Sequence, residues 1–406
     1  MIDTSRSMLF HIGNLNTESQ RISYQMATGE NQELGSEDAM LHARLINIED
    51  KLRVTESLKL QITKSNVMNE VADSSMEELK RLLGTGTNTI QTDLLKGLNS
   101  GMQRSDMLAL ATNLRGMREN MIDMVNVRVD NEYVFAGSNT TEQTMTKDAA
   151  FPLNGQIEFD GDGFLRKIAV QPGSYRDRGV TAYDVVFYTA SKANAGETFT
   201  FSEGERIIDE SGYEWKLNGA GTMLQQYDHN GIIFHPPVEE PISATTAQVY
   251  PNADGQETKA TYSINVPAAS AGRVFEAKHN YFDDLNIIIN ALEGYRTAPD
   301  GQKDTGIELT DEEVRKTLSN GLGLTSKQFD ATNIGHGELG GRNAVFEVAY
   351  EKLTSQETHY NILLQETGGA DMAKLAMESK SLEMTYQALY STISKMNSMS
   401  LVNFIN

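Results

Sequence analysis

Two long helical repeats stand at opposite ends of the chain. Toward the C-terminus, a mainly apolar series recurs at alternating steps of three and four: Phe346, Ala349, Leu353, Gln356, Tyr360, Leu363, Thr367 and Ala370, then Leu375, Ser379, Leu382, Tyr386, Leu389, Ile393 and Met396. The N-terminal end has the same spacing at Met8, Ile12, Leu15, Ser19, Ile22 and Met26, and again from Leu41 to Ile62. This spacing predicts long helices with one apolar stripe and a coiled-coil-like seam.

A long helix with an apolar stripe is not stable alone in water, because most of its stability comes from packing that stripe against something else. Both chain ends carry such a stripe, so we predict that they pair with each other. Periodicity leaves one alternative open, in which the two ends are unrelated amphipathic helices on one globular body.

Composition narrows the class of protein. At 406 residues the chain exceeds one compact core, and 56 acidic residues against 35 basic ones give a net charge of -21. This balance argues against nucleic acid or an anionic membrane as a partner. The absence of cysteine excludes disulfides, thiolate metal sites and cysteine nucleophiles. No stretch is long and apolar enough to span a bilayer, and residues 1–10 do not form a general secretory signal.

The predicted order of elements is helices, a β-rich insert, then helices. Helices are expected from Met1 to Thr28 with Gly29 as C-cap, from a cap at Ser36 to Leu83, from Ser105 to Asn131, from Val274 to Leu292, and from a capping box at Thr310 and Glu313 to a break at Gly321–Gly323. Strands are expected at Ile157–Phe159, Phe164–Val170, Tyr183–Tyr188, Thr198–Phe201, Tyr213–Leu217, Ile232–Phe234 and Tyr262–Val266. The fold class is therefore mainly α, with long terminal helices packed as a coiled-coil-like bundle and an antiparallel β domain inserted between them.

No catalytic, cofactor or metal site is predicted. The seven histidines are scattered, without the spacing of metal ligands on a helix. Asp160-Gly161-Asp162-Gly163 resembles the start of a calcium loop but lacks its later ligands, so a turn is expected. Residues 335–340 formally match GxGxxG, yet no strand precedes them. We therefore expect no cofactor, no metal and no enzyme.

Several motifs resemble the flagellin superfamily of bacterial flagella. Arg21-Ile22-Ser23 with Ala27-Thr28-Gly29 is similar to its N-terminal element, although Glu30 replaces the usual basic residue. Near the other end, Gly340-Gly341-Arg342-Asn343 and the ending Ser400–Ile405 also match. Tyr133-Val134-Phe135-Ala136-Gly137, followed by Phe159–Gly163, is similar to the hook-filament junction (hook-associated protein 3) family within that superfamily.

This resemblance implies an exported structural subunit of the extracellular flagellum. It implies terminal assembly helices at 1–40 and 370–406 that are disordered in the monomer, a helical rod at 41–141 and 271–369, and an outward β-rich domain at 142–270. The expected partners are other copies of the chain in a ring, the neighbouring hook-associated protein and flagellin, and the chaperone and type III apparatus of flagellar export.

The terminal stripes supply the expected assembly interface: Ile12, Leu15, Ile22, Met26, Leu382, Tyr386, Leu389, Ile393, Met396, Leu401 and Phe404. The family motif residues are Arg21, Thr28, Gly29, Tyr133, Phe135, Gly137, Gly341, Arg342 and Asn343. Two alternatives stay open. One is flagellin, the filament subunit, and the other is an extracellular adhesin or enzyme whose ligand binds in the β insert.

Overall fold

The computed structural model describes residues 2–31, 38–147, 156–228, 231–246, 260–266, 274–298 and 301–405. Within these ranges it describes the backbone alone at 2–5, 8, 246 and 396–405. The chain divides into two compact units: unit 1 comprises Met1–Leu60 with Tyr350–Asn406, and unit 2 is Gln61–Ala349. The two boundaries fall inside the long helices, so unit 1 is built from two segments far apart in the sequence, whereas unit 2 is one continuous stretch.

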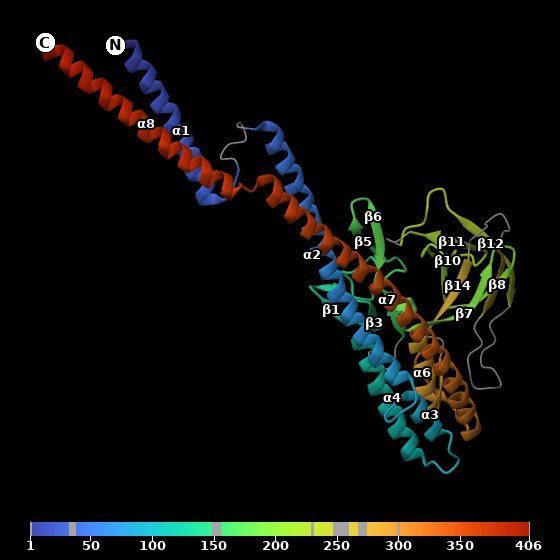
Figure 1. The fold of residues 1–406 in the computed structure, drawn as a ribbon. Coiled ribbons are helices and arrows are strands. Elements are labelled where there is room, and N and C mark those ends of the chain that lie inside the picture. Colours follow the sequence, from blue (N-terminus) through green and yellow to red (C-terminus); the bar gives the residue numbers. More distant parts are fainter. Residues whose placement is uncertain are drawn as a thin grey trace. The chain divides into compact units, whose positions relative to one another are not determined.

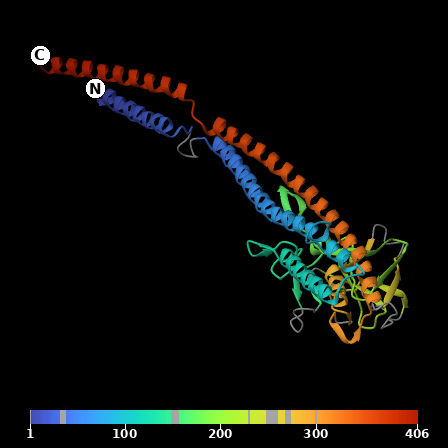
Figure 2. The same ribbon diagram turned by 90° about the horizontal axis from the view of Figure 1, so that it is seen from below.

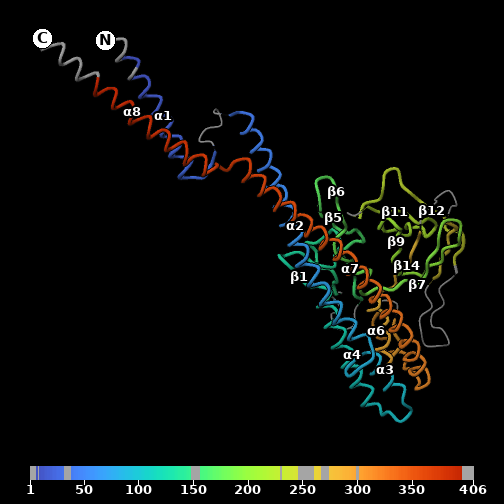
Figure 3. The backbone as a smooth tube through the Cα atoms, viewed as in Figure 1, coloured from blue at the N-terminus to red at the C-terminus, as the bar shows by residue number. Residues whose placement is uncertain are grey.

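Unit 1 contains two helix pairs. In the first, α1 (Ile2–Thr28) and α8 (Met372–Ile405) run side by side and antiparallel (Figures 1 and 3). In the second, the first half of α2 (Ala39–Leu83) lies beside the last half of α7 (Asp311–Gly368), as Figure 2 also shows. Lys59 of α2 forms an ion pair with Glu357 of α7, and its ammonium lies 5.0 Å from the centre of the Tyr350 ring.

The helical body of unit 2 combines the end of α2, α3 (Ile90–Gly97), α4 (Arg104–Val125), α6 (Tyr281–Leu292) and the start of α7. On α4 the apolar positions recur at helical spacing and are buried: Leu110, Leu114, Met117, Met121 and Val125. They pack with apolar residues of the other helices in one continuous core, in which Met76, Leu79, Leu285 and Leu318 are fully buried. The start of α7 thus joins the N-terminal helices of unit 2.

The insert is built on an eight-stranded antiparallel sheet with the order β7-β14-β9-β10-β11-β12-β13-β8. Its strands are β7 (Phe187–Asn194), β8 (Thr198–Ser202), β9 (Arg206–Asp209), β10 (Glu214–Leu217), β11 (Met223–Tyr227), β12 (Glu239–Thr246), β13 (Thr261–Asn265) and β14 (Val274–Asn280). Its two outer strands, β7 and β8, are consecutive and contact each other, with Ser191 donating a hydrogen bond to the Thr200 carbonyl. The sheet therefore curls around its own apolar core, which contains Phe199, Trp215 and Phe275.

Shorter elements surround these two bodies. The two-stranded hairpins are β1 (Arg128–Val129) with β2 (Glu132–Tyr133), β3 (Met145–Lys147) with β4 (Ile157–Phe159), β5 (Arg166–Gln171) with β6 (Ser174–Arg178), and β15 (Tyr295–Thr297) with β16 (Lys303–Glu308). A one-turn helix, α5 (Ala182–Val185), precedes β7.

A group of charged side chains joins the sheet to the helical body where β14 runs into α6. The imidazole of His279 lies 3.1 Å from Asp284 and 3.8 Å from Glu205, and the Tyr188 hydroxyl donates to Asp284 at 2.9 Å. Burial disfavours the imidazolium, but the hydrogen bonds and charges of Asp284 and Glu205 outweigh it and raise the pKa of His279 to about 10. The connection is therefore held by a protonated histidine at neutral pH.

Several sequence predictions are confirmed. The first helix ends at Thr28, with Gly29 in the left-handed region at φ +74°. The long second helix ends at Leu83, and Ile157–Phe159 forms a strand with the predicted bounds. Thr310 and Glu313 exchange the two hydrogen bonds of a capping box. The mainly α class with an antiparallel β insert is likewise what the structure shows.

Other predictions are wrong, and local packing or capping explains each. Gly321–Gly323 does not break α7. Gly321 is instead a packing position within the helix, because a Cβ there would lie 2.6 Å from the Ile288 Cδ1 of α6. The predicted helix from Val274 starts only at Tyr281, where Asn280 caps it and accepts from the Phe282 amide. The preceding residues alternate in burial as a strand does.

Three more segments differ from the prediction. Residues 182–185 are helical rather than extended, because the Asp184 carboxylate accepts from the Thr181 amide and starts a helical turn. Ile232–Phe234 forms an isolated bridge through Ile233 instead of a strand. At the start of α2 the capping side chain is Asp38, which accepts from the amides of Met40 and Leu41, whereas Ser36 lies outside the described residues.

Candidate assembly surface

The predicted terminal stripes face each other in unit 1. Between Met372 and Lys395, the residues of α8 are exposed except Glu378 and the predicted positions. Of the predicted positions, Leu375 is buried and Ser379, Leu382, Tyr386, Leu389 and Ile393 are half-buried. On α1, Ile22 is buried, and Ile12 and Leu15 are half-buried. Met26 is 42% exposed, and the neighbouring Gln25 is buried in its place. The side chains of Met396, Leu401 and Phe404 lie outside the described residues.

Arg21, in the motif that resembles the flagellin superfamily, links α1 to α8. Its guanidinium forms an ion pair with Glu18 one turn earlier and lies 3.3 Å from the Glu378 carboxylate on α8. Hydrogen bonds and charge from these two carboxylates outweigh partial burial and raise the pKa of Arg21. The charged guanidinium thus lies between carboxylates of both helices, at the base of their stripe.

The interruptions between α1 and α2 and between α7 and α8 are joined by backbone hydrogen bonds. The Ala370 amide donates to the Gly29 carbonyl at 2.8 Å, and the Asn31 amide donates to the Gly368 carbonyl at 2.7 Å. Glu30 and Gly369 thus form an antiparallel bridge. Thr28 supports it, because its hydroxyl accepts from the Glu30 amide at 3.1 Å. Residues 28–31 and 368–370, at the two helix interruptions, thus form one hydrogen-bonded joint.

Outside the seam, the helix pair exposes further large apolar side chains. Leu9 and Phe10 on α1 are 68% and 66% exposed, and Met377, Met384 and Tyr390 on α8 are 68%, 58% and 62% exposed. Met377 and Met384 are seven residues apart and lie on the side of α8 opposite the seam. Pairing of α1 with α8 therefore covers only part of the apolar surface of these helices.

The charge of the two terminal helices is balanced, in contrast to the rest of the chain. On α1 the charged residues are Asp3, Arg6, Glu18 and Arg21, and on α8 they are Lys374, Glu378, Lys380, Glu383 and Lys395. The pair thus has a net charge close to zero in a chain of net charge -21. Copies of this surface can meet without the repulsion that acidic surfaces would impose.

The motif that resembles the junction family lies in unit 2. Phe135 is completely buried, and its carbonyl accepts from the Ala182 amide at 2.9 Å. The Tyr133 ring lies 4.8 Å from the Arg128 guanidinium carbon. Gly137, at φ +76°, packs directly against Asp162, leaving no room for a side chain. These residues fix the start of the insert.

The second motif in unit 2 lies on α7. Arg342 donates to the Gly179 carbonyl at 2.7 Å and pairs with Glu338 at 3.0 Å. It therefore anchors the chain just after β6 to α7. Its neighbours Gly341 and Asn343 lie on the same helix, where Gly341 is exposed and Asn343 half-buried.

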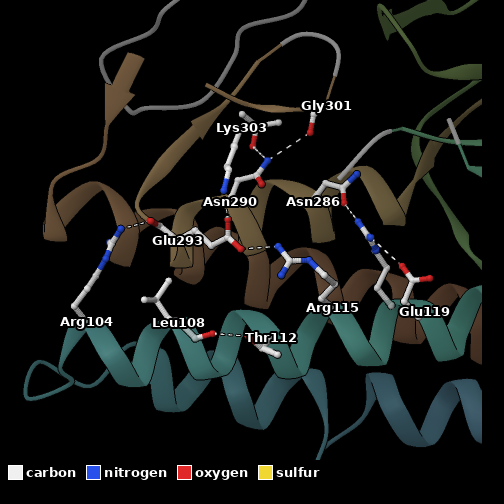
Figure 4. Close-up of polar contacts among 12 residues, drawn as sticks. Arg104, Leu108, Thr112, Arg115, Glu119, Asn286, Asn290, Glu293, Gly301 and Lys303 are labelled. Atoms are coloured by element: carbon white, nitrogen blue, oxygen red, sulfur yellow. Dashed lines mark hydrogen bonds and ion pairs between the residues drawn. The ribbon is translucent and has the colours of Figure 1, made fainter. Parts of the chain in front are cut away.

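A polar network that the sequence analysis did not predict joins α4 to α6 (Figure 4). The Glu293 carboxylate binds Arg115 at 2.5 Å and Lys303 at 3.1 Å, while its carbonyl accepts from Arg104. One helical turn away, the almost fully buried Arg118 donates to Asn286 and pairs with Glu119 at 2.9 Å. The residues are spread over 104–303, so no local pattern marks them.

The insert contains a polar cavity of about 520 Å³ whose lining includes the carboxylates Asp160, Asp162, Glu214 and Asp228. Each binds a neighbouring group: Asp160 accepts from Thr146 at 2.6 Å, Asp162 from the Ser138 amide at 2.9 Å, and Asp228 from the Ile232 amide at 2.8 Å. Glu214 pairs with Arg206 at 3.1 Å and Lys216 at 3.2 Å. Asp160–Gly163 is a bent segment between β4 and β5, and its two carboxylates are engaged in structural hydrogen bonds.

Residues 335–340, the GxGxxG match, lie inside α7 and not in a loop between a strand and a helix. Across the described ranges, no cluster of three His, Asp or Glu residues has the arrangement of a metal site. Among the described helices, none combines the length and apolarity that crossing a bilayer requires.

Comparison with known proteins gives structural similarities only. No family model matches the chain, and neither does any curated protein. A flagellar hook-associated protein of Vibrio parahaemolyticus is 12% identical with a TM-score of 0.49, covering 82% of this chain and 100% of its own. Hook-associated protein 3 of Legionella pneumophila is 16% identical with a TM-score of 0.43, covering 81% and 98%. FlgL of Xanthomonas campestris is 15% identical with a TM-score of 0.42, covering 80% and 98%.

Proposed function

We propose that this chain is a structural subunit of the bacterial flagellum, forming the junction layer between a hook-associated layer and the flagellin filament. Two observations support the proposal. The motifs around Arg21 and Arg342 resemble the flagellin superfamily, and the motif around Phe135 resembles the junction family within it; in the structure each of these residues makes a contact between separate segments of the chain. The second observation is the partly covered apolar surface of α1 and α8, which supports assembly with neighbouring copies.

Assembly would be driven by covering that surface. Leu9, Phe10, Met377, Met384 and Tyr390 expose large apolar area, which is worth roughly 25 cal/mol per Å² when it is buried. Contacts with neighbouring copies would bury it together with the half-buried seam, in a coiled-coil-like inner layer. We propose that 1–40 and 370–406 are disordered in the monomer, since ordering costs about 1–2 kcal/mol per residue and the seam alone buries little.

The remaining parts would support this layer. Residues 41–141 and 271–369 would form the rod through which neighbouring subunits meet, and 142–270 would face outward. The subunits would close into a ring whose two sides are unlike, and would thereby bind different neighbours above and below. Export by the type III apparatus with a chaperone, and a location in the extracellular flagellum, complete the proposal. It assigns the chain no catalytic role and no cofactor.

The direct test is a strain that lacks this gene. Electron microscopy should show hooks without filaments, with flagellin shed into the medium, and plasmid expression of the chain should restore filaments. Normal filaments in the deletion strain would overturn the proposal. Purified chain that grows unaided into long filaments would instead identify a filament subunit.

A point variant tests the mechanism in the complemented strain. Leu389→Asp or Ile393→Asp places a charge in the seam, so we expect secreted, folded chain that does not enter the junction. Leu389→Met keeps the apolar volume and should be incorporated normally. Melting of unit 2 in the Leu389→Asp variant would contradict the mechanism, because the loss would then be one of folding.

A further inference from the structure

The β5–β6 hairpin is a basic patch on an acidic chain. Between Arg166 and Arg178 it carries Arg166, Lys167, Arg176 and Arg178 against Asp177 alone, while the whole chain has a net charge of -21. Tyr175, between its basic residues, is 57% exposed, and Lys167 and Arg176 are exposed as well. Such a combination of exposed tyrosine and arginine is typical of protein interfaces.

The chain neutralises only part of this charge. Arg166 and Arg178 lie directly opposite each other across the two strands, which is unfavourable for like charges. Both turn to one carboxylate, that of Glu132, at 2.6 Å and 3.8 Å. Arg176 contacts the Ser174 hydroxyl and the Tyr175 carbonyl of its own strand. The hairpin thus keeps surplus positive charge on its surface.

A complementary acidic segment lies where β16 leads into α7. Asp304, Glu308, Asp311, Glu312 and Glu313 follow one another without an intervening basic residue, before Arg315 and Lys316. Glu313 is engaged in the capping box with Thr310. Glu308, Asp311 and Glu312 are exposed, and the latter two also lie in the first turn of α7, where negative charge is stabilised by the helix dipole.

These two patches cannot meet within one copy. Arg342 of α7 holds the Gly179 carbonyl, immediately after β6, which places the end of the hairpin beside Arg342. Because an α-helix rises about 1.5 Å per residue, Asp311 lies about 46 Å from Arg342 along α7. No side chain spans that distance, so pairing of the patches requires two copies.

We infer that the β5–β6 hairpin of one copy docks on the acidic segment Glu308–Glu312 of a second copy, as a head-to-tail contact. The inference rests on the proposed function insofar as copies assemble. Each copy thus carries a basic surface at the hairpin and an acidic surface at the start of α7. Binding of the basic surface of one copy to the acidic surface of the next would be a heterologous interface. The strong net negative charge and the few basic residues disfavour nucleic acid as the occupant.

The absence of cysteine allows a direct cross-linking test on the full chain. Tyr175→Cys and Glu312→Cys variants, mixed and treated with a short bismaleimide, should give a cross-linked dimer. The control pair is Ser74→Cys, at an exposed site on α2, mixed with Glu312→Cys. The hairpin pair should give roughly tenfold more cross-linked dimer than this control pair. The yield of the hairpin pair should fall in 0.5 M salt, where charge interactions are screened. Adding Arg176→Glu to the Tyr175→Cys chain should lower the cross-linking yield to that of the control pair. Adding Asp311→Arg to the Glu312→Cys chain as well should restore the higher yield, because the two charges are then reversed together.

Equal yields for the hairpin and control sites, or no restoration by Asp311→Arg, would overturn the inference. So would binding of a duplex DNA that Arg176→Glu removes, since the occupant would then be nucleic acid. Repeating the cross-link with Leu389→Asp separates the two proposals. A cross-link that persists there supports this contact whatever happens at the junction, whereas normal incorporation of Leu389→Asp would contradict the proposed mechanism alone.

Discussion

The guanidinium of Arg21 lies 3.3 Å from the carboxylate of Glu378, across the seam between the first and the last helix of the chain. Eight residues after Arg21 and eight before Glu378, just beyond the two helices, the Gly29 carbonyl accepts from the Ala370 amide. These contacts set the antiparallel alignment of α1 and α8. The helix pair is thus defined by a few polar contacts at its base, and the apolar stripe extends away from them.

Reversing one charge of this ion pair should weaken the base of the seam. Both side chains are about one-third exposed, so Glu378→Lys should cost under about 1 kcal/mol of seam stability in assembled junctions, where α1 and α8 are expected to be ordered. Arg21→Glu combined with Glu378→Lys should recover most of that loss. A double-mutant cycle on hydrogen exchange in α1 measures the coupling, and single-mutant effects that simply add would show that the contact contributes nothing.

The joint between the helix interruptions should depend on Gly369. A Cβ there would collide with the Gln365 carbonyl oxygen, so Gly369→Ala should displace the strand-like bridge to Glu30. In assembled junctions we expect faster exchange of the Asn31 and Ala370 amides, measured by hydrogen exchange with mass spectrometry.

Gly13→Ala is the matched control for the glycine substitution. A Cβ at Gly13 has no neighbour within 4 Å, so this variant should only strengthen α1, by about 1 kcal/mol from helix propensity. Equal exchange at the joint in the two variants would show that the backbone bridge tolerates a side chain at Gly369.

The sequence predicted those parts of the fold that depend on local interactions, and it failed where contacts with distant residues decide the structure. The Leu375–Ile393 stripe was predictable because burial on one helix face has a fixed period, and the structure places those residues on the least exposed side of α8. Gly321 was misread as a break because its neighbour Ile288 comes from another helix. The helix start at Tyr281 depends on the Asn280 cap, a signal in the sequence that could have been used.

The buried Arg118 gives a prediction for the network of Figure 4. Asn286→Leu removes an acceptor from a nearly inaccessible cation, and burial already lowers the pKa of this arginine. We expect a loss of about 3 kcal/mol in the unfolding free energy of unit 2. Arg118→Met with Asn286→Leu should be less destabilised than Asn286→Leu alone, and chemical denaturation should show this order. A double variant less stable than the single one would contradict the role assigned to the buried charge.

The histidine beside Asp284 should make stability depend on pH. The pKa of His279 is raised to about 10 in the folded chain, against about 6.5 when unfolded, so the folded state holds an extra proton between these values. This stabilisation is complete below about pH 6.5 and is lost as pH rises toward 10, at about 1.4 kcal/mol per pH unit.

Fluorescence of Trp215, the single tryptophan and part of the sheet core, reports this unfolding. His279→Gln should remove the slope above pH 6.5, since glutamine does not titrate. Tyr188→Phe, which keeps both His279 and its carboxylate partners, should retain most of it. An unchanged slope in His279→Gln would assign the pH dependence to another group.

Only part of the proposed assembly surface was predictable from the sequence, again because periodicity is local whereas the alignment of the two helices is not. Ile22 and Leu389 follow from periodicity, whereas the backbone bridge at Gly29 and the pairing of Arg21 with Glu378 require knowing how the helices align. Met26 carries the expected period yet is exposed, because the seam turns toward Gln25 at the end of α1. The network around Glu293 combines residues nearly 200 positions apart, which no sequence pattern marks.

The most direct measurement compares hydrogen exchange of α1 and α8 in dilute monomer with that in assembled junctions. The account predicts rapid exchange from Ile2 to Thr28 and from Met372 to Ile405 in the monomer, and strong protection after assembly, because neighbouring copies would complete the burial. Equal, strong protection of both helices in the lone chain would contradict it.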